Sequence, residues 1–404
     1  MKKVYRSPLS IAATAFLACQ ASSVVMAAGF TEALTGGKAY GDFRMRYEMV
    51  EQDNMLKDAD GLILRSRLGY KTGEYNGFSA LAEFEDSRVV AAMDDYNNSL
   101  GFHTQYSVIA DPETTELDQA FVQYKSDSFT SKLGRQVITL DNHRFVGDVG
   151  WRQDRQTFDA FLLNFKPVEN LDLLYAFLGE RNRIFADASD IDSKDHLVNA
   201  AYKTSLGTVT AYAYLLEVDN NTDNALDTFG LRFNGSAKAA DTKLLYTIEF
   251  ASQESEAGAS EFEAEYIFVE GGVEVGGITA TIAYELLGSD DGAYGFSTPL
   301  ATLHKFNGWT DQFLATGALG LEDIMLTLSG KLAGGKLVAV YHDFSADEAS
   351  ATVEDLGSEI DLLYAKKFGK NYNAGVKYAA YSAGDKASSK VDTDKFWLWV
   401  GATF

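Results

Sequence analysis

The chain has 404 residues, one cysteine and a formal net charge of −23 at pH 7. Such an acidic chain is a poor partner for nucleic acid, because phosphate backbones attract basic surfaces. Tyrosine and phenylalanine are abundant, with 21 and 26 copies, whereas proline occurs only 4 times. No apolar run is long enough for a membrane-spanning helix, so two predictions remain: a soluble β protein or a transmembrane β-barrel.

The first 27 residues have the features of a secretory signal peptide. Basic residues near the N-terminus precede the apolar run Leu9–Ala18, and Val25 and Ala27 are the small residues expected before a cleavage site. We predict cleavage after Ala27, with the next bond nearly as favourable, and a single mature domain over residues 28–404. The only cysteine falls within the predicted peptide, so the mature domain would contain no disulfide.

Alternating apolar and polar residues recur from residue 38 to the C-terminus and predict β-strands. The segment Phe43–Met49, FRMRYEM, is typical. We predict about eighteen strands of roughly ten to twelve residues, the length that a tilted membrane-spanning strand needs. They are expected near residues 38–50, 60–72, 77–88, 116–126, 129–138, 155–166, 170–181, 194–204, 207–218, 226–235, 240–251, 260–271, 275–287, 322–332, 335–345, 357–368, 371–383 and 393–404.

The connections alternate between long polar loops and tight turns. The long connections are 51–59, 86–115, 139–154, 182–193, 288–321, 346–356 and 384–392, and short links such as Ala333-Gly334 lie between them. A transmembrane barrel explains this alternation, because its periplasmic turns are short and its external loops are long. A soluble sandwich offers no reason for it.

The final segment, Lys395–Phe404, alternates and ends in an aromatic residue. This ending resembles the signal by which outer-membrane barrels are recognised for assembly. An even number of strands lets the first and last strands pair and close the sheet. We therefore predict an all-β, antiparallel transmembrane barrel in the bacterial outer membrane. Its expected partners are lipid, lipopolysaccharide and the barrel-assembly machinery, the last through the strand that ends at Phe404.

The parity of the first strand distinguishes its lipid face from the lumen. Phe43, Met45 and Tyr47 alternate with Arg44 and Arg46. An arginine on the lipid face at the bilayer midplane costs roughly 2–4 kcal/mol, so we expect both arginines to point into the lumen. The same alternation on neighbouring strands predicts a basic stripe, whose members are Arg44, Arg46, Arg65, Arg67 and Lys395.

Glutamates are also predicted to face the lumen, at Glu83 and Glu85 on the third strand and at Glu261, Glu263 and Glu265 on the twelfth. Two interpretations of the arginines follow. Guanidinium groups bind carboxylates bidentately and stay charged, which suits a path for anionic solutes. Alternatively, Arg65 and Arg67 pair with Glu83 and Glu85 and merely brace the wall.

The sequence has no nucleophile elbow, phosphate loop or dinucleotide motif, and its five histidines lack the spacing of metal ligands. Asp187, Asp190, Asp192 and Asp195 lie close together, but their spacing departs from that of calcium-binding loops. We expect a solvated external loop there. The prediction is a protein that is not an enzyme and that has no cofactor or metal site.

Three groups of motifs stand out from residue 134 onwards. They are Gly134-Arg135-Gln136 with Trp151-Arg152 and Thr157-Phe158-Asp159; HKFNGWTDQFL at 304–314; and Tyr341-His342-x-Phe344 with Gly357-x-Glu359-Ile360-Asp361-Leu362. Together they resemble the bacterial alginate-export family of outer-membrane porins. The resemblance implies an 18-stranded barrel with an electropositive constriction that passes an anionic polyuronate.

The resemblance also implies roles for individual residues. Arg135 matches the arginine of the family's Gly-Arg-Gln motif, and Arg152 matches the basic residue beside the family's tryptophan. The expected pore-lining and anion-binding residues are therefore Arg44, Arg46, Arg65, Arg67, Arg135, Arg144, Arg152, Lys305 and Lys395. Loop 288–321 is a candidate to fold into the lumen, with His304, Trp309 and Asp311 at the constriction, unless its aromatic residues only pin it to the wall.

The function predicted from the sequence is passive passage of anionic solutes, such as a polyuronate or oligosaccharide, through an arginine-bearing constriction. Two alternatives stay open. One is a general or cation-preferring diffusion porin whose acidic loops dominate selectivity. The other is a structural or adhesive barrel whose lumen is plugged. Measurable conductance would separate the plugged barrel from the porins, and the sign of ion selectivity would separate the porins.

Overall fold

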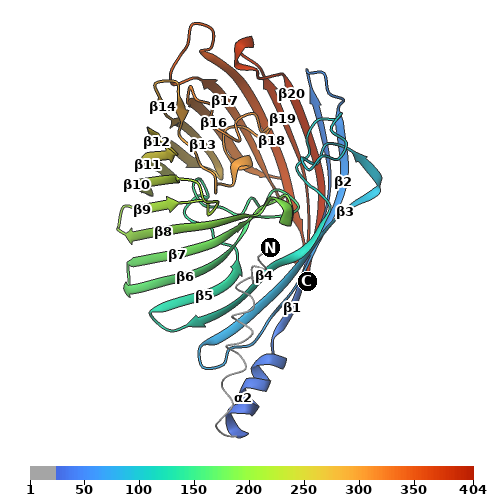
Figure 1. Cartoon of the computed structure of the whole chain (residues 1–404), viewed down its shortest axis with the longest axis vertical. Coiled ribbons are helices and arrows are strands. Elements are labelled where there is room, and N and C mark those ends of the chain that lie inside the picture. The colour runs from blue at the N-terminus through green and yellow to red at the C-terminus, as the bar shows by residue number, and fades with distance from the viewer. Residues whose placement is uncertain (1–23) are drawn as a thin grey trace.

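The protein is a closed antiparallel β-barrel in the computed structural model, which describes residues 24–404 (Figure 1). Eighteen strands form one sheet, and it closes because β1 (Lys38–Gln52) pairs with both β2 (Ala59–Lys71) and β20 (Thr393–Thr403). The predicted fold class and strand number are confirmed. The predicted signal peptide, residues 1–27, lies almost entirely outside the described residues.

Each predicted strand has one counterpart in the barrel. After β1 and β2 come β3 (Phe78–Asp95), β4 (Thr114–Lys125), β5 (Phe129–Gln136), β6 (Thr157–Val168), β7 (Leu171–Asn182), β8 (Ile191–Lys203), β9 (Thr208–Leu216), β10 (Asn224–Ala239), β11 (Thr242–Ala257), β12 (Ser260–Val275), β13 (Ile278–Leu287), β16 (Leu321–Leu332), β17 (Gly335–Ser345), β18 (Asp355–Phe368), β19 (Tyr372–Ser382) and β20. Sequential strands pair throughout, so the barrel is an up-and-down meander.

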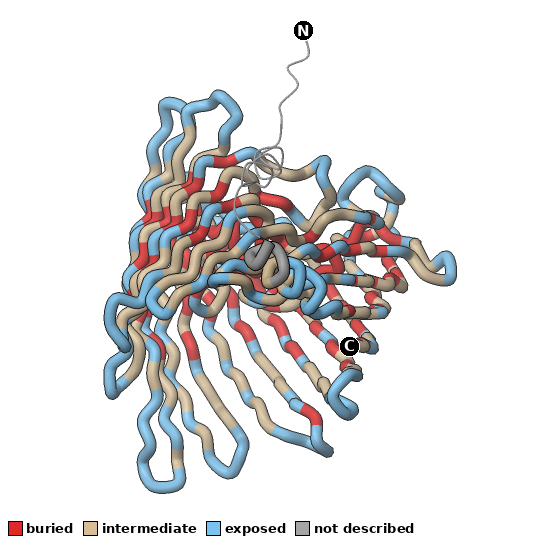
Figure 2. Tube along the Cα trace, turned by 90° about the horizontal axis from the view of Figure 1, so that it is seen from below, coloured by how far each residue is buried: buried red, intermediate tan, exposed pale blue. Residues whose placement is uncertain are grey.

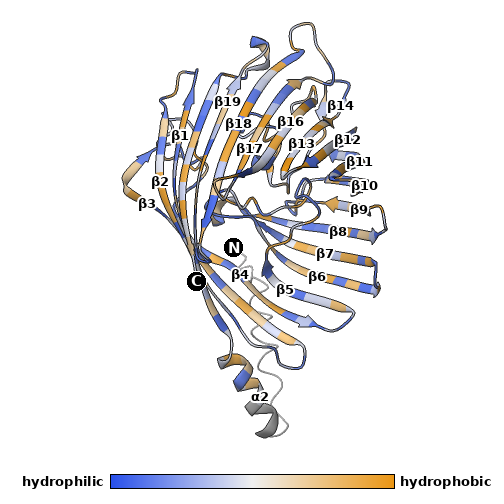
Figure 3. Ribbon diagram, turned by 180° about the vertical axis from the view of Figure 1, so that it is seen from behind, coloured by the Kyte–Doolittle hydropathy of each residue, from blue (hydrophilic) through white to orange (hydrophobic). Residues whose placement is uncertain are grey.

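Hydrophobic and hydrophilic residues alternate along the strands, as Figure 3 shows, and buried residues recur at alternate positions (Figure 2). On β1, Met45 is 38% exposed on the outer surface, whereas Arg46 and Glu48 are each 1% exposed. On β20, Leu398 and Val400 lie outward and Lys395 and Trp397 are buried. This parity places the apolar set toward lipid and the charged set in the lumen.

The two rims of the barrel differ. One rim has turns of two to six residues, and α2 (Val24–Thr35) lies against it, where the Gly73 amide donates to the Ala33 carbonyl at 2.8 Å. The other rim bears the long connections, with a tight turn at Gly258 as the exception. We call them the short-turn rim and the long-loop rim; in outer-membrane barrels the short turns are periplasmic. Among the described residues, no helix is long and apolar enough to cross a membrane.

The prediction that the glutamates of β12 face the lumen is wrong. Ala264 and Tyr266 occupy the buried lumen positions, and Glu263 and Glu265 are exposed on the outside. β10, β11 and β12 each have 16 residues, whereas about 9–11 span the bilayer. The ends of these strands on the long-loop side therefore project beyond the lipid, where an outward glutamate meets water at little cost.

Two long loops fold into the barrel (Figure 1). The β5–β6 loop comprises residues 137–156, and the β13–β16 loop comprises residues 288–320, which include the small hairpin of β14 (Ser289–Asp290) and β15 (Tyr294–Gly295) and the 3-10 turn η2 (Leu303–Lys305). Phe145 of the first loop contacts Tyr266 of the wall and Phe296 of the second, with ring centroids 5.2 and 5.9 Å apart. The hydrophobic core of this membrane protein thus lies inside the barrel.

Candidate functional site in the lumen

The β5–β6 loop lies against β1, where two of the predicted pore arginines hold it. Arg44 donates to the Trp151 carbonyl at 2.8 Å and to the Gln153 side chain at 3.0 Å. Arg46 donates to the same Trp151 carbonyl and to the Asp111 carboxylate, and its guanidinium lies 4.9 Å from the Trp151 ring centroid. These arginines fix the position of Trp151 in the lumen.

A second contact joins both inward loops to the wall. Arg152 donates to Glu48 at 3.1 Å and to Asp311 of the β13–β16 loop at 2.8 Å, and Lys395 donates to Asp311 at 2.7 Å. Although burial opposes it, the carboxylates of Glu48 and Asp311 raise the pKa of Arg152. Burial also opposes ionisation of Asp311, yet the hydrogen bond from His304 and the charges of Lys395 and Arg152 hold its pKa well below the usual range. Both groups therefore stay charged in this network.

Arg46 and Arg152 have carboxylate partners, and so do the four predicted arginines outside these contacts. Arg65 pairs with Asp42, Arg67 with Glu85, Arg135 with Asp159 at 2.8 Å, and Arg144 with Glu285 at 2.7 Å. The alternative in which Arg67 braces the wall through Glu85 thus matches the observed pair. The proposed pairing of Arg65 with Glu83 is wrong, because Asp42 on the adjacent β1 lies closer and Arg155 from the β5–β6 loop pairs with Glu83 instead.

Arg135 owes its position to the glycine before it. Gly134 has a φ of +122°, and a Cβ there would lie 2.3 Å from the Ala120 carbonyl oxygen of the neighbouring strand. Only glycine permits that approach without strain. β5 ends at Gln136, directly after Arg135, and the β5–β6 loop then enters the lumen.

The motifs at 304–314 and 357–362 meet in the structure. At Gly308 the chain turns with a φ of +86°, and the next turn places the amide and hydroxyl of Thr310 on the Glu359 carboxylate at 2.8 and 2.6 Å. Asn307 donates to Glu285 at 2.7 Å and to Asp323 at 3.1 Å. The β13–β16 loop is therefore tied to β13, β16 and β18 by hydrogen bonds to buried carboxylates.

Lys377 of β19 was not among the residues predicted from the sequence, although it is the only charged residue of its strand. Its ammonium lies 3.8 Å from the ring centroid of Trp309, 4.3 Å from that of Trp151 and 5.0 Å from that of Trp397. An ammonium surrounded by aromatic faces is stabilised by cation–π attraction. No carboxylate of the described residues lies within 4.0 Å of it.

His304 connects this lysine to the charged network. Its ring is nearly parallel to that of Trp151, with centroids 5.2 Å apart, and its two nitrogens contact Asp311 at 2.6 Å and Lys377 at 2.7 Å. Burial, reinforced by Lys377, lowers the pKa of His304 to about 3. The imidazole is therefore neutral, with Nδ1–H donating to Asp311 and Nε2 accepting from Lys377.

Lys305, next in the chain, is exposed and donates to the Asn142 carbonyl at 2.7 Å. Burial of part of its stem and the nearby Arg232 lower its pKa. Lys305 thus links the two inward loops but lies apart from the cluster of His304, Trp309 and Asp311.

Pockets lie on both sides of these contacts. A pocket of about 300 Å³ near the long-loop rim is lined by Arg144, Arg181 and Arg183, together with residues 297–299 and 313–316. Arg181 binds Asp195 with two contacts of 2.7 Å, whereas the guanidinium of Arg183 lies 5.5 Å from the Phe185 ring centroid. No carboxylate of residues 24–404 lies within 4.0 Å of Arg183.

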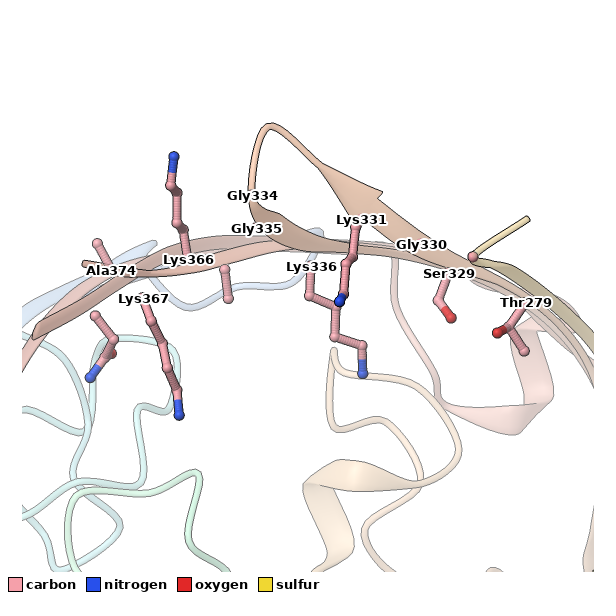
Figure 4. Close-up of a pocket in the computed structure, with 13 residues that line it drawn as sticks. Thr279, Ser329, Gly330, Lys331, Gly334, Gly335, Lys336, Lys366, Lys367 and Ala374 are labelled. Carbon is pink, nitrogen blue, oxygen red and sulfur yellow. The ribbon is translucent and has the colours of Figure 1, made fainter. Parts of the chain in front are cut away.

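A larger pocket, of about 620 Å³, lies near the short-turn rim. Lys336 and Lys367 point to the side of the sheet where the inward loops lie, and Lys366 points to the opposite side (Figure 4). Lys331 and Lys336 are directly opposite each other on β16 and β17. Within the described chain, no carboxylate approaches Lys331, Lys336 or Lys367 to 4.0 Å. We call Lys331, Lys336 and Lys367 the lysine cluster.

The closed barrel and its polar, charged lumen define the class of protein: an outer-membrane porin, located in the bacterial outer membrane. The sequence model of a family described as alginate export matches residues 39–286, more than half of the chain. The chain belongs to the alginate export family, as the motifs from residue 134 onwards predict.

Solved structures share the fold at low sequence identity. OccAB4 of Acinetobacter baumannii superimposes with a TM-score of 0.69 at 14% identity, covering 91% of this chain and 98% of that one. OccK9 (OpdG) of Pseudomonas aeruginosa superimposes with a TM-score of 0.72 at 13% identity, covering 92% of this chain and 99% of that one. OpdK of the same organism, solved with vanillate, superimposes with a TM-score of 0.68 at 13% identity, covering 91% of this chain and 98% of that one. No curated protein matches the chain.

Proposed function

We propose that this porin passes anionic solutes passively, and that uronate oligomers or polymers are the class to which it is suited. One observation carries the proposal: lumen cations without a carboxylate partner lie on both sides of the constriction. Arg183 lines the pocket near the long-loop rim, and the lysine cluster lines the pocket near the short-turn rim.

Like charges directly opposite each other on neighbouring strands destabilise a sheet. Lys331 and Lys336 nevertheless form such a pair in a wide pocket, where no described carboxylate compensates them. An anionic solute would supply the missing charge. A uronate polymer carries a carboxylate on each sugar, so several ammonium groups can engage it at once.

The buried arginines have a different part in this proposal. Arg44, Arg46 and Arg152 hold the β5–β6 loop, and with it Trp151, inside the lumen. Their own charges are already engaged with carbonyl and carboxylate oxygens. We infer that they shape the arginine-bearing constriction, while the cations without carboxylate partners attract the solute.

The test is the reversal potential of the purified protein in a planar bilayer under a salt gradient, with and without oligouronates. We expect anion preference and block by oligouronates in the wild type. The triple variant Lys331→Gln, Lys336→Gln, Lys367→Gln should lose several-fold in anion preference, because a unit charge about 4 Å from an anion is worth about 1 kcal/mol even in water. Lys366→Gln is the matched control, since Lys366 lies on the same strand as Lys367 but points to the other face (Figure 4).

Each alternative has its own result. Cation preference that the triple variant leaves unchanged would identify a general or cation-preferring diffusion porin and contradict the proposal. The absence of any conductance through a correctly folded barrel would identify a plugged structural barrel, consistent with the many buried ion pairs at mid-lumen.

We further infer that β20 carries the assembly signal read by the barrel-assembly machinery. Phe404 is 67% exposed and stacks on Phe43 with ring centroids 6.2 Å apart, and its amide donates to the Gly41 carbonyl at 3.1 Å. The terminal aromatic ring is thus exposed on the lipid side, beside Phe43, while its backbone pairs with β1. Phe404→Ser should reduce the amount of folded barrel in the outer membrane while leaving refolding in detergent unchanged.

A further inference from the structure

Three carboxylates from separate parts of the chain converge in the lumen. Glu85 comes from β3, Glu116 from β4 and Asp154 from the β5–β6 loop, and one oxygen atom of each lies within 4.8 Å of the others. Glu85 is 1% exposed and Asp154 is 3% exposed, and Glu116 is half-buried. We call Glu85, Glu116 and Asp154 the carboxylate triad.

Each member of the triad has an oxygen without a partner. Among the described residues, no amide, hydroxyl, ammonium or guanidinium group donates to Glu85 Oε1, Glu116 Oε1 or Asp154 Oδ2, although all three atoms are buried. Leaving a buried polar atom unsatisfied costs roughly 1–3 kcal/mol, and more when the group is charged. The arrangement lacks a positive charge.

The neighbouring arginines do not supply that charge to the free oxygens. Arg67 binds the other oxygen of Glu85, Oε2. Arg155 binds Asp118 and Glu83, and Arg135 binds Asp159. The nearby cations therefore leave the unpartnered oxygens of the three carboxylates without compensation.

We propose that the carboxylate triad binds a divalent cation, with Ca²⁺ as the ion that fits best. Ca²⁺ binds oxygen ligands at about 2.3–2.6 Å, so two ligands on opposite sides of one ion are up to about 5 Å apart. The 4.8 Å limit on the triad's oxygen separations agrees with a single ion. The set is all carboxylate, with no imidazole or thiolate, which favours Ca²⁺ or Mg²⁺ over zinc and copper. Three carboxylates with water as the remaining ligands suit Ca²⁺, because its coordination geometry is flexible. Mg²⁺ fits less well, because it requires nearly ideal octahedral geometry.

The ion has a structural consequence for the pore. Asp154 follows Trp151, Arg152 and Gln153, the residues through which the loop contacts Arg44 and Arg46 of β1. A cation shared by Asp154, Glu85 and Glu116 would fasten that segment to β3 and β4. Loss of the ion would free one side of the constriction, so conductance would depend on Ca²⁺.

The experiment uses the full-length barrel in detergent, treated with EGTA and free of lipopolysaccharide. Tb³⁺ is added as a luminescent substitute for Ca²⁺, its emission is excited through tryptophan, and CaCl₂ is then used to compete it away. We expect one competable site in the wild type, at least tenfold weaker in Asp154→Asn and in Glu116→Gln. The control Glu261→Gln/Glu263→Gln removes two acidic residues outside the lumen and should keep the site.

Each variant must first be shown to form a folded barrel. A folded barrel migrates differently on a gel before and after the sample is heated. Equal Tb³⁺ emission and Ca²⁺ competition in wild type and both variants would overturn the proposal. So would an infrared band of a protonated carboxyl that persists in CaCl₂ and is removed by Asp154→Asn, since it would show that a shared proton takes the place of the ion.

A conductance measurement completes the test. EGTA should alter the single-channel conductance of the wild type and leave that of Asp154→Asn unchanged; an equal response of both would contradict the structural role of the ion. This outcome is independent of anion preference, which the lysine cluster tests at the other end of the lumen.

Discussion

At the constriction, Arg152 lies between Glu48 and Asp311, whose side chains are 2% and 7% exposed. At the short-turn rim, Lys331 faces Lys336 across two strands, and both are exposed within a pocket of about 620 Å³. The two regions contain cations of the same lumen but differ in solvation. A buried cation needs a compensating partner, whereas one in a water-filled pocket does not.

This difference teaches which positive residues of the lumen are structural and which are available to a solute. Removing Arg152 takes one cationic partner from each of the buried carboxylates Glu48 and Asp311 and should disturb the loops. Removing a lysine of the cluster leaves no described carboxylate without a partner and should alter selectivity more than stability. Four predictions test this comparison.

The largest effect is expected for Arg152→Met. It leaves Glu48 and Asp311 short of a partner, and breaking a buried ion pair from one side costs about 3–5 kcal/mol. Thermal unfolding in detergent, followed by circular dichroism, measures the loss. Arg88→Met is the control, because the Arg88–Asp86 pair is 47% and 38% exposed and should contribute about 0–1 kcal/mol. Equal effects in the two variants would remove the distinction between buried and exposed pairs.

Next is Gly308→Ala in the β13–β16 loop. A left-handed conformation costs a residue with a Cβ roughly 1–2 kcal/mol, and at Gly308 that Cβ would also lie 2.3 Å from a Glu359 oxygen. Gly276→Ala is the matched control, because Gly276 also has a positive φ, +59°, but a Cβ added there would have no atom within 4 Å. Thermal unfolding should show a larger loss for Gly308→Ala; a difference of zero would mean that the contact of Gly308 with Glu359 is relieved without cost.

The third prediction concerns acid and His304. Burial, followed by the charge of Lys377, lowers the folded-state pKa of His304 to about 3, so between about pH 6.5 and 3 only the unfolded chain binds this proton. Stability is therefore lost as the pH falls below 6.5, by about 1 kcal/mol over the first unit. The thermal midpoint should fall less between about pH 6.5 and about pH 5.5 for His304→Gln than for the wild type. Identical pH profiles would mean that His304 does not contribute.

The smallest stability change is expected in the lysine cluster. Lys336→Glu places opposite charges across from each other and should stabilise the sheet by about 0.2–1 kcal/mol. The same substitution should reduce anion preference in the reversal-potential measurement. Lys366→Gln should change neither property by a comparable amount. A marked loss of stability in Lys336→Glu would show that this lysine braces the wall after all.

Much of the barrel follows from local pattern. The side chains of a strand alternate between two faces, so the sequence alone indicates eighteen strands, and the arginines of β1 show which face is wet. Glu261, Glu263 and Glu265 show where that reasoning fails. Their assignment to the lumen assumes that the outer face of the strand is apolar. The end of β12 projects beyond the lipid, and that assumption no longer applies there.

The motifs of the β13–β16 loop illustrate an intermediate case. HKFNGWTDQFL resembles a segment of the family, and we expect from the sequence that the loop folds into the lumen. The reason for its residues lies elsewhere in the chain, since Gly308 and Thr310 accommodate Glu359, and Asp311 connects Arg152 with Lys395. Those partners are distant in sequence, and no periodicity relates them.

The sequence by itself determined the class of fold, the number of strands, the lipid-facing parity and the family, because each depends on neighbouring residues or on short motifs. Only the tertiary structure decided which cations are paired, where Lys377 lies among three tryptophans, and that Glu85, Glu116 and Asp154 converge. The physical reason is that charge pairing in the lumen depends on which strands are neighbours and on the loops that fold into the barrel. Those contacts depend on distance in space, which the order of residues along the chain does not specify.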